Sequence, residues 1–228
     1  AADAYGLSRF ADRIRYCGFI HFAQKKMNKE DARNMLGLGQ EPLVVMTAGG
    51  GHDAYPMMKF VLDALQSRQF GSDFKLVIVT GPLMPLAERE IIETLSATCG
   101  ATCIASTPKL QAYLVAADTI LTMGGYNTVM ESIASGVPTI VIPRTGPSAE
   151  QRCRAQMFAE LGLIQCIDRE WNSHDDLTSA IATALASPVR KTPAIAFNGI
   201  RNASRALASA VNVRQTIMRS QRQATVAA

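Results

Sequence analysis

The sequence of 228 residues contains no apolar run near the roughly 20 residues that a helix needs to cross a bilayer. No leader is visible, and because the chain begins Ala-Ala-Asp, we expect a processed chain or a piece of a longer one. With 48% hydrophobic and 18% charged residues, a sizeable core is expected and a disordered chain is not. We therefore predict a cytoplasmic globular protein, with peripheral contact at the inner membrane face as a further expectation.

Metal-binding and redox patterns are also missing. The cysteines number five, an odd count, and no C-x-x-C pair occurs, which indicates reduced thiols. Cys99 and Cys103 are the closest pair, but no histidine lies near them, so we predict no zinc site. The chain lacks an Asp-x-Asp motif, a G-x-G-x-x-G and the Lys-Ser/Thr of a P-loop. We predict no metal and no cofactor.

Acidic residues stop at Asp176. The segment after it contains seven basic residues, namely Arg190, Lys191, Arg201, Arg205, Arg214, Arg219 and Arg222. A solvated helical tail explains this segment, and so does contact with an acidic partner or an anionic membrane. We expect no nucleic-acid partner.

Apolar runs alternate with helical periodicity along most of the chain. This alternation predicts an α/β fold with a doubly wound, parallel, Rossmann-like sheet. Strands are predicted at residues 14–20, 43–48, 75–80, 102–105, 118–123, 138–143 and 164–167. Helices are predicted at residues 28–36, 55–69, 85–98, 108–116, 128–135, 149–161, 174–187 and 198–210.

Ligands of such a sheet bind outside the carboxyl ends of its strands. The first candidate segment there is TAGGGHDAYP, residues 47–56. Gly49, Gly50 and Gly51 leave bare N–H groups, and the following helix points its positive end at them, which suits a phosphate. The alternative is a tight turn with Asp53 as the helix cap.

The second candidate segment is LTMGGYNTVMESIASGVPTIVIPR, residues 121–144. Gly124 and Gly125 follow a predicted strand and precede a helix, so two glycine-rich strand exits could hold the two phosphates of a diphosphate. Thr128 and Glu131 have the spacing of a capping box. The other interpretation is that the Glu131 carboxylate accepts hydrogen bonds from ribose hydroxyls.

The third candidate segment is PRTGPSAEQRCRA, residues 143–155. Glu150 and Gln151 stand at a predicted helix start, where they could bond several sugar hydroxyls. An acidic residue in a first helical turn is also favoured by the helix dipole alone.

The stretches GGGHD, GGYNTVMESIASGVPTIVIPR and EQRCRA, in this order and spacing, resemble the C-terminal half of GT-B glycosyltransferases. The most similar groups are the N-acetylglucosaminyltransferases that build the peptidoglycan lipid intermediate and related predicted glycosyltransferases. The resemblance covers residues 14–210 and is most specific over 123–155. It implies a domain that binds a nucleotide-diphosphate sugar, with UDP as the expected nucleotide and without a metal.

The resemblance also implies residue roles. Glu131 would bind the ribose, Gly124 and Gly125 would face the diphosphate, and Gln151 with Glu150 would bind the hydroxyls of the donor sugar. Where some relatives have Gln, this chain has Glu150.

Further donor contacts are implied by the same resemblance. The Gly49–His52 loop would approach the phosphates, and the backbone of Ser106 and Thr107 would meet the base. Close relatives have an apolar or aromatic residue where this chain has Ser106. Asn127 and Thr128 complete the expected donor site.

GT-B enzymes have two doubly wound domains, and the acceptor and usually the catalytic base belong to the first. The resemblance therefore implies an N-terminal acceptor domain or a separate acceptor subunit as partner. We expect residues 1–13 to be a linker, 14–210 the donor-binding domain, and 211–228 a basic tail.

Two other functions fit the same fold. One is a nucleotide-sugar epimerase or hydrolase, for which His52 and Glu150 are the available acid and base candidates. The other is a nucleotide-binding domain without catalysis.

Overall fold

The computed structural model describes residues 8–21, 27–68, 74–146, 149–187 and 195–211. The chain divides into two compact units, one of Ala23–Pro193 and a smaller one of Ala1–Phe22 with Ala194–Ala228. Each is described by itself. The division into linker, donor-binding domain and tail stays a prediction, and the tail beyond Val211 lies outside the described residues.

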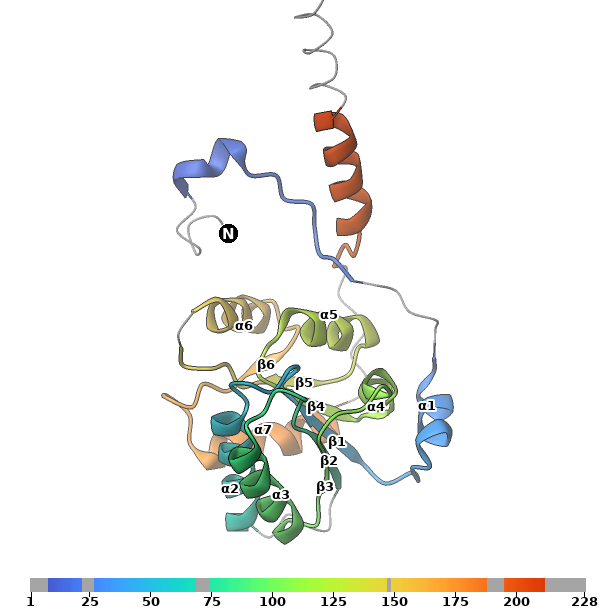
Figure 1. Ribbon diagram of the computed structural model, residues 1–228, viewed down its shortest axis with the longest axis vertical. Coiled ribbons are helices and arrows are strands. Elements are labelled where there is room, and N and C mark those ends of the chain that lie inside the picture. Colours follow the sequence, from blue (N-terminus) through green and yellow to red (C-terminus); the bar gives the residue numbers. More distant parts are fainter. Residues whose placement is uncertain (1–7, 22–26, 69–73, 147–148, 188–194, 212–228) are drawn as a thin grey trace, which may run out of the picture. The chain divides into compact units, whose positions relative to one another are not determined.

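The larger unit contains a parallel sheet of six strands, in the order β3-β2-β1-β4-β5-β6 (Figure 1). This confirms the predicted fold class. The strands are β1 Leu43–Thr47, β2 Lys75–Val79, β3 Thr102–Ile104, β4 Thr119–Thr122, β5 Thr139–Val141 and β6 Gln165–Cys166.

Helices cover both faces of the sheet, which explains why the central strands are apolar at successive positions. One buried cluster joins strand side chains to α2, α3 and α7, and a second joins the opposite side chains to α1 and α4. The helices are α1 Lys29–Leu36, α2 Tyr55–Arg68, α3 Leu86–Thr98, α4 Leu110–Ala116, α5 Tyr126–Ser135, α6 Glu150–Glu160 and α7 His174–Ala186.

A charged cluster fixes the amino ends of β1 and β4. Asp118 Oδ2 accepts hydrogen bonds from Arg33 Nη2 at 2.7 Å and from the Leu43 N–H at 2.7 Å, and its other oxygen pairs with Lys29. Arg33 is only 4% exposed, yet its guanidinium also donates to the Ala116 carbonyl. The two strands at the centre of the sheet therefore start from one shared anchor.

The strand predicted at residues 14–20 is wrong. These residues belong to the smaller unit and have no regular secondary structure. The Gly199 N–H donates to the Phe19 carbonyl at 3.0 Å, and Asn202 Nδ2 donates to the Cys17 carbonyl at 2.9 Å. The apolar run thus meets the start of a helix at residues 199–211, not a strand.

The remainder of the smaller unit is short. Residues Ser8–Arg13, expected to be part of a linker, form a 3-10 helix. Among the residues that the structure describes, no helix is both long and apolar enough to cross a membrane.

Candidate functional site

The site expected from the sheet topology is at β1 and β4, where the strand order reverses. Strands β2 and β3 continue from β1 on one side, and β5 and β6 continue from β4 on the other. Connections leaving such neighbours diverge to opposite faces and leave a crevice beyond the carboxyl ends. Thr47 and Thr122, the last residues of these strands, are paired in register. The glycines of both predicted segments follow these two residues.

The loop after β1 is held by backbone packing against the loop after β2. Gly51 has φ +92°, and a Cβ there would lie 2.3 Å from the Thr80 carbonyl oxygen. The Leu83 N–H donates to the Gly50 carbonyl at 2.8 Å. Gly49 and Gly50 are exposed, as is His52, whose side chain is 77% accessible. These contacts therefore anchor the loop, while its backbone and the His52 imidazole are exposed to solvent.

Asp53 is not the cap of α2, because the first intrahelical bonds run to the Ala54 carbonyl from Met57 and Met58. Its carboxylate instead accepts a hydrogen bond from Arg144 Nη1 at 2.6 Å. Arg144 follows β5, so this ion pair joins the exits of β1 and β5, on either side of β4. The Nε of Arg144 is buried and has no hydrogen-bond partner.

The loop after β4 is Met123-Gly124-Gly125. Gly124 has φ +88°, and a Cβ there would lie 2.8 Å from Val141 Cγ1, so only glycine fits. Gly125 is the N-cap of α5, and no side chain caps the helix. The capping box predicted for Thr128 and Glu131 is wrong, because Thr128 is buried inside the helix, three residues past its N-cap.

The residues of α5 and α6 that we predicted for the donor lie around this loop. Asn127 is exposed in the first turn of α5, and Glu131 is half-buried in the second. Glu150 and Gln151 open α6. Gln151 lies against Gly124, where an added Cβ would be 3.9 Å from the Gln151 Cβ. The Oε1 of Gln151 is buried and has no hydrogen-bond partner.

Ser106 and Thr107 follow β3, further along the same edge of the sheet. Ser106 is exposed, and Thr107 Oγ1 accepts from the Lys109 N–H at 3.1 Å. The Gly81 N–H donates to the Ala105 carbonyl at 2.9 Å. The loops after β1, β2 and β3 are therefore linked in series by backbone contacts.

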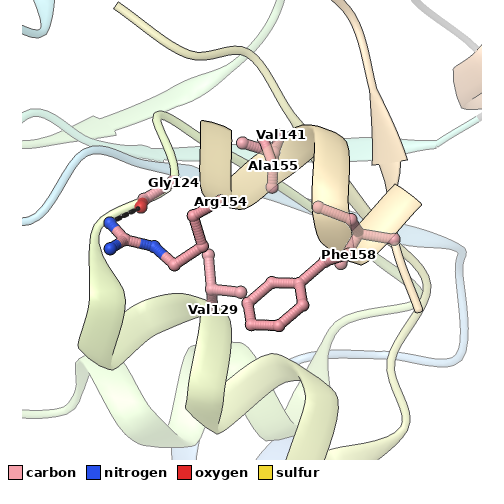
Figure 2. Close-up of a pocket in the computed structure, with 7 residues that line it drawn as sticks. Gly124, Val129, Val141, Arg154, Ala155 and Phe158 are labelled. Carbon is pink, nitrogen blue, oxygen red and sulfur yellow. Dashed lines mark hydrogen bonds between the residues drawn. The ribbon is translucent and has the colours of Figure 1, made fainter. Parts of the chain in front are cut away.

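Sequence reasoning missed two arginines and two threonine hydroxyls at this edge. Arg154 Nη2 donates to the Gly124 carbonyl at 2.9 Å (Figure 2), and its Nη1 pairs with Glu150 Oε1 at 2.6 Å. The Oγ1 atoms of Thr47 and Thr122 are buried without a hydrogen-bond partner. The Glu150–Arg154 spacing of four residues was the available signal for Arg154. Nothing in the sequence marked the threonines.

The cysteines form no disulfide. All five are free. Burial, with a smaller contribution from Asp168, raises the pKa of Cys166 to about 11. In the described part of the chain, no three His, Cys, Asp or Glu side chains are grouped as metal ligands would be.

Comparison with known proteins identifies the family of this chain. The family model described as glycosyltransferase family 28 C-terminal domain matches residues 44–209. The NDP-glycosyltransferase YjiC of Bacillus subtilis (strain 168) is 27% identical over 154 residues, which cover 67% of this chain and 36% of that protein.

Solved structures share the fold. MurG from Acinetobacter baumannii aligns with a TM-score of 0.55 at 18% identity, over 77% of this chain and 48% of that chain. The C-terminal CMP-Kdo binding domain of WaaA from Acinetobacter baumannii aligns with a TM-score of 0.51 at 12% identity, over 69% of this chain and 87% of that chain. This chain spans less than half the length of YjiC and MurG. The expected resemblance to the C-terminal half of GT-B enzymes is confirmed.

Proposed function

The chain belongs to the glycosyltransferase family 28 C-terminal domain family, and from this premise we propose that it binds the nucleotide-diphosphate sugar donor of a glycosyltransferase. One observation supports this most strongly. The two glycine-rich loops follow neighbouring strands, β1 and β4, at the reversal of strand order. Each loop precedes a helix N-terminus, where N–H groups and the helix dipole favour an anion.

The diphosphate would lie between these loops. The start of α5 supports this, because its N-cap is Gly125, which has no side chain to accept a hydrogen bond from the first N–H groups. Two arginines flank the β4 exit, Arg144 from the β5 exit, paired with Asp53, and Arg154 from α6, paired with Glu150. The leaving diphosphate would be stabilised by N–H groups, helix ends and these cations, without a metal.

The nucleoside and the sugar of the donor would lie on either side of the diphosphate. The ribose would meet Glu131, and the base would reach Ser106 and Thr107 along the loops after β2 and β3. The sugar would meet Glu150 and Gln151, and the unpartnered Oε1 of Gln151 supports this role because it is a ready acceptor for a hydroxyl.

The complete enzyme would need a second half. This chain covers 36% of YjiC and 48% of MurG, which leaves room in those proteins for another domain of similar size. Transfer requires an acceptor hydroxyl, a base and the donor carbon held together. We propose that the acceptor and the base are supplied by that other half, and that the basic tail contacts it or an anionic membrane.

A hydrolase or epimerase is a weaker proposal for this chain. Such an enzyme needs an acid and a base fixed within the same crevice. The imidazole of His52 is 77% accessible, and its nearest charged group is Asp53 at 3.9 Å. The Glu150 carboxylate is held by Arg154.

Calorimetry with UDP, GDP and ADP, each in buffer with and without EDTA, tests the proposed function. We expect at least one diphosphate to bind with equal affinity in both buffers. Binding that EDTA abolishes would contradict metal independence. The absence of binding for all three would contradict the donor site.

Replacing Glu131 with Gln tests the ribose contact. A hydrogen bond to a charged group contributes about 1.5–3 kcal/mol, so Glu131→Gln should lower diphosphate affinity about tenfold or more. The melting temperature, measured on the same variant, separates a loss of affinity from a loss of stability. Glu160→Gln, at the far end of α6, is the control and should change neither quantity. A drop in stability without a drop in affinity would make Glu131 a structural residue.

A further inference from the structure

The Gly124 carbonyl is held in place by a side chain from another element. Arg154 reaches from the second turn of α6 to this carbonyl, and its other terminal nitrogen bonds the Glu150 carboxylate (Figure 2). One guanidinium therefore joins the loop after β4 to the first residue of α6. These are the two places proposed above for the diphosphate and for the sugar.

The direction of the guanidinium is set by its surroundings. The Arg154 side chain is 11% exposed, and its stem lines an apolar pocket with Val129, Val141, Ala155, Phe158 and Ile164 (Figure 2). The packing leaves no space there for a water molecule. The guanidinium carbon lies 5.7 Å from the centre of the Tyr126 ring, within the range of a cation–π contact. An arginine packed in this way has little freedom to turn.

The bond to Gly124 has a consequence for Gly125. In a trans peptide the carbonyl of one residue and the N–H of the next point in opposite directions. Since Arg154 holds the Gly124 carbonyl, it also fixes the Gly125 N–H, which points away from Arg154. That N–H stands at the uncapped start of α5. Because Gly124 and Gly125 have no Cβ, the peptide between them can rotate more freely than one between other residues, so an external restraint matters here.

The arrangement leaves one donor unused. The Nε of Arg154 is buried without an acceptor, an unfavourable state for a charged group. A residue needed only to fill the apolar pocket would not require a guanidinium. Arg152, on the same helix, uses its own guanidinium for Asp168 and Glu170.

We propose that Arg154 is a positioning residue, which couples the diphosphate end of the donor site to its sugar end by holding the Gly124–Gly125 peptide and the Glu150 carboxylate at once. The proposal rests on the proposed donor site. A lysine cannot replace Arg154, because one ammonium on a flexible stem cannot hold the carbonyl and the carboxylate in the same fork geometry.

The test measures UDP and uridine affinity for wild type, Arg154→Lys, Arg154→Met and the control Arg152→Lys. GDP with guanosine, or ADP with adenosine, replaces this pair if that diphosphate binds wild type more tightly. Arg154→Lys should weaken diphosphate binding about tenfold and nucleoside binding less than about twofold. Arg154→Met should weaken diphosphate binding further, and Arg152→Lys should leave it unchanged.

Coupling is tested by adding Glu150→Gln alone and in the Arg154→Lys background. Glu150→Gln should weaken UDP binding by less than Arg154→Lys does, and should have no further effect in the double variant. If the effects of Glu150→Gln and Arg154→Lys on UDP affinity add in the double variant, the proposed coupling is wrong. Equal losses for diphosphate and nucleoside, or equal losses in the Arg152 control, would show that Arg154 only supports the fold. Failure of every diphosphate to bind wild type would instead overturn the proposed function, and this inference with it.

Discussion

Gly124 and Gly125 are adjacent, but the structure requires glycine only at the first. A side chain at Gly124 would need φ +88° and would collide with Val141. Gly125 has φ −56° and ψ 136°, which any residue adopts, and no atom lies within 4 Å of an added Cβ. Folding therefore leaves Gly125 without an explanation, whereas a ligand close to the backbone would supply one.

We predict that Gly125→Ala folds with a melting temperature close to that of wild type but loses diphosphate affinity by about tenfold, because the new methyl group occupies ligand space. Gly124→Ala should instead melt at a lower temperature. Thermal unfolding by circular dichroism and calorimetry with UDP measure both effects. Unchanged affinity in a stable Gly125→Ala would show that no ligand approaches this residue.

At the scale of elements, the sequence pattern predicted the regular strands and helices well but predicted the irregular segments poorly. The central strands were predictable because they are buried on both faces and read as continuous apolar runs. The run at residues 14–20 is also largely apolar, although it includes Arg15 and Gly18. Its backbone bonds a helix start 180 residues away, which no local pattern encodes. The start of α5 was misplaced because Thr128 looks like a cap although Gly125 takes that position.

The candidate site was likewise predictable only in part. The positions of its glycines after strand ends, and of Glu150 and Gln151 at a helix start, were predictable from local sequence patterns, whereas their roles in donor binding stay predictions. The partners of Arg144 and Arg154 were not predictable, since both contacts join segments that only the tertiary structure brings together, 91 and 30 residues apart.

The start of α7 yields a prediction about pH. Ser173 and Asp176 form a capping box, in which the Ser173 N–H, and secondly its hydroxyl, lower the pKa of Asp176. A lowered folded-state pKa stabilises the protein above the unfolded pKa of about 3.9, and this contribution is lost as pH falls through the folded pKa. The stability advantage of wild type over Asp176→Asn should thus be present at pH 6 and shrink below about pH 4.

Urea unfolding of both proteins across this range, followed by circular dichroism, measures the difference. Ser173→Ala should cost about 1 kcal/mol at neutral pH, as the loss of an N-cap does. A wild-type advantage that is independent of pH would show that the Asp176 carboxylate does not contribute through its charge.

At the scale of the whole molecule, the helix at residues 199–211 has an exposed apolar stripe. Ile200, Leu207 and Val211 are spaced along one face and are 43%, 68% and 54% exposed. We propose this face as a contact for an acceptor-binding half of the enzyme, with Arg201 and Arg205 to one side of the stripe. The isolated chain should then bind the donor but transfer no sugar.

This predicts that mixing the chain with a separately expressed acceptor-binding domain of a family 28 glycosyltransferase, together with radiolabelled UDP-sugar, restores transfer. Leu207→Glu should prevent restoration and leave UDP affinity unchanged, whereas Ser209→Glu, on the opposite side of the helix, should be neutral for both. Transfer by the isolated chain would contradict the need for a second half. Normal restoration with Leu207→Glu would remove the helix from the interface.

The central claim, that a nucleotide diphosphate binds beyond the carboxyl ends of β1 and β4, is tested most directly by the glycines themselves. NMR spectra of the chain labelled with ¹⁵N-glycine report its 16 glycines separately. Gly37, Gly100, Gly136 and Gly162 precede strands and lie at the amino ends of the sheet, whereas Gly49, Gly50, Gly51, Gly124 and Gly125 follow strands. Saturation with the diphosphate that binds most tightly should shift the second group and leave the first unchanged. Shifts confined to the first group, or absent from both loops, would contradict the account.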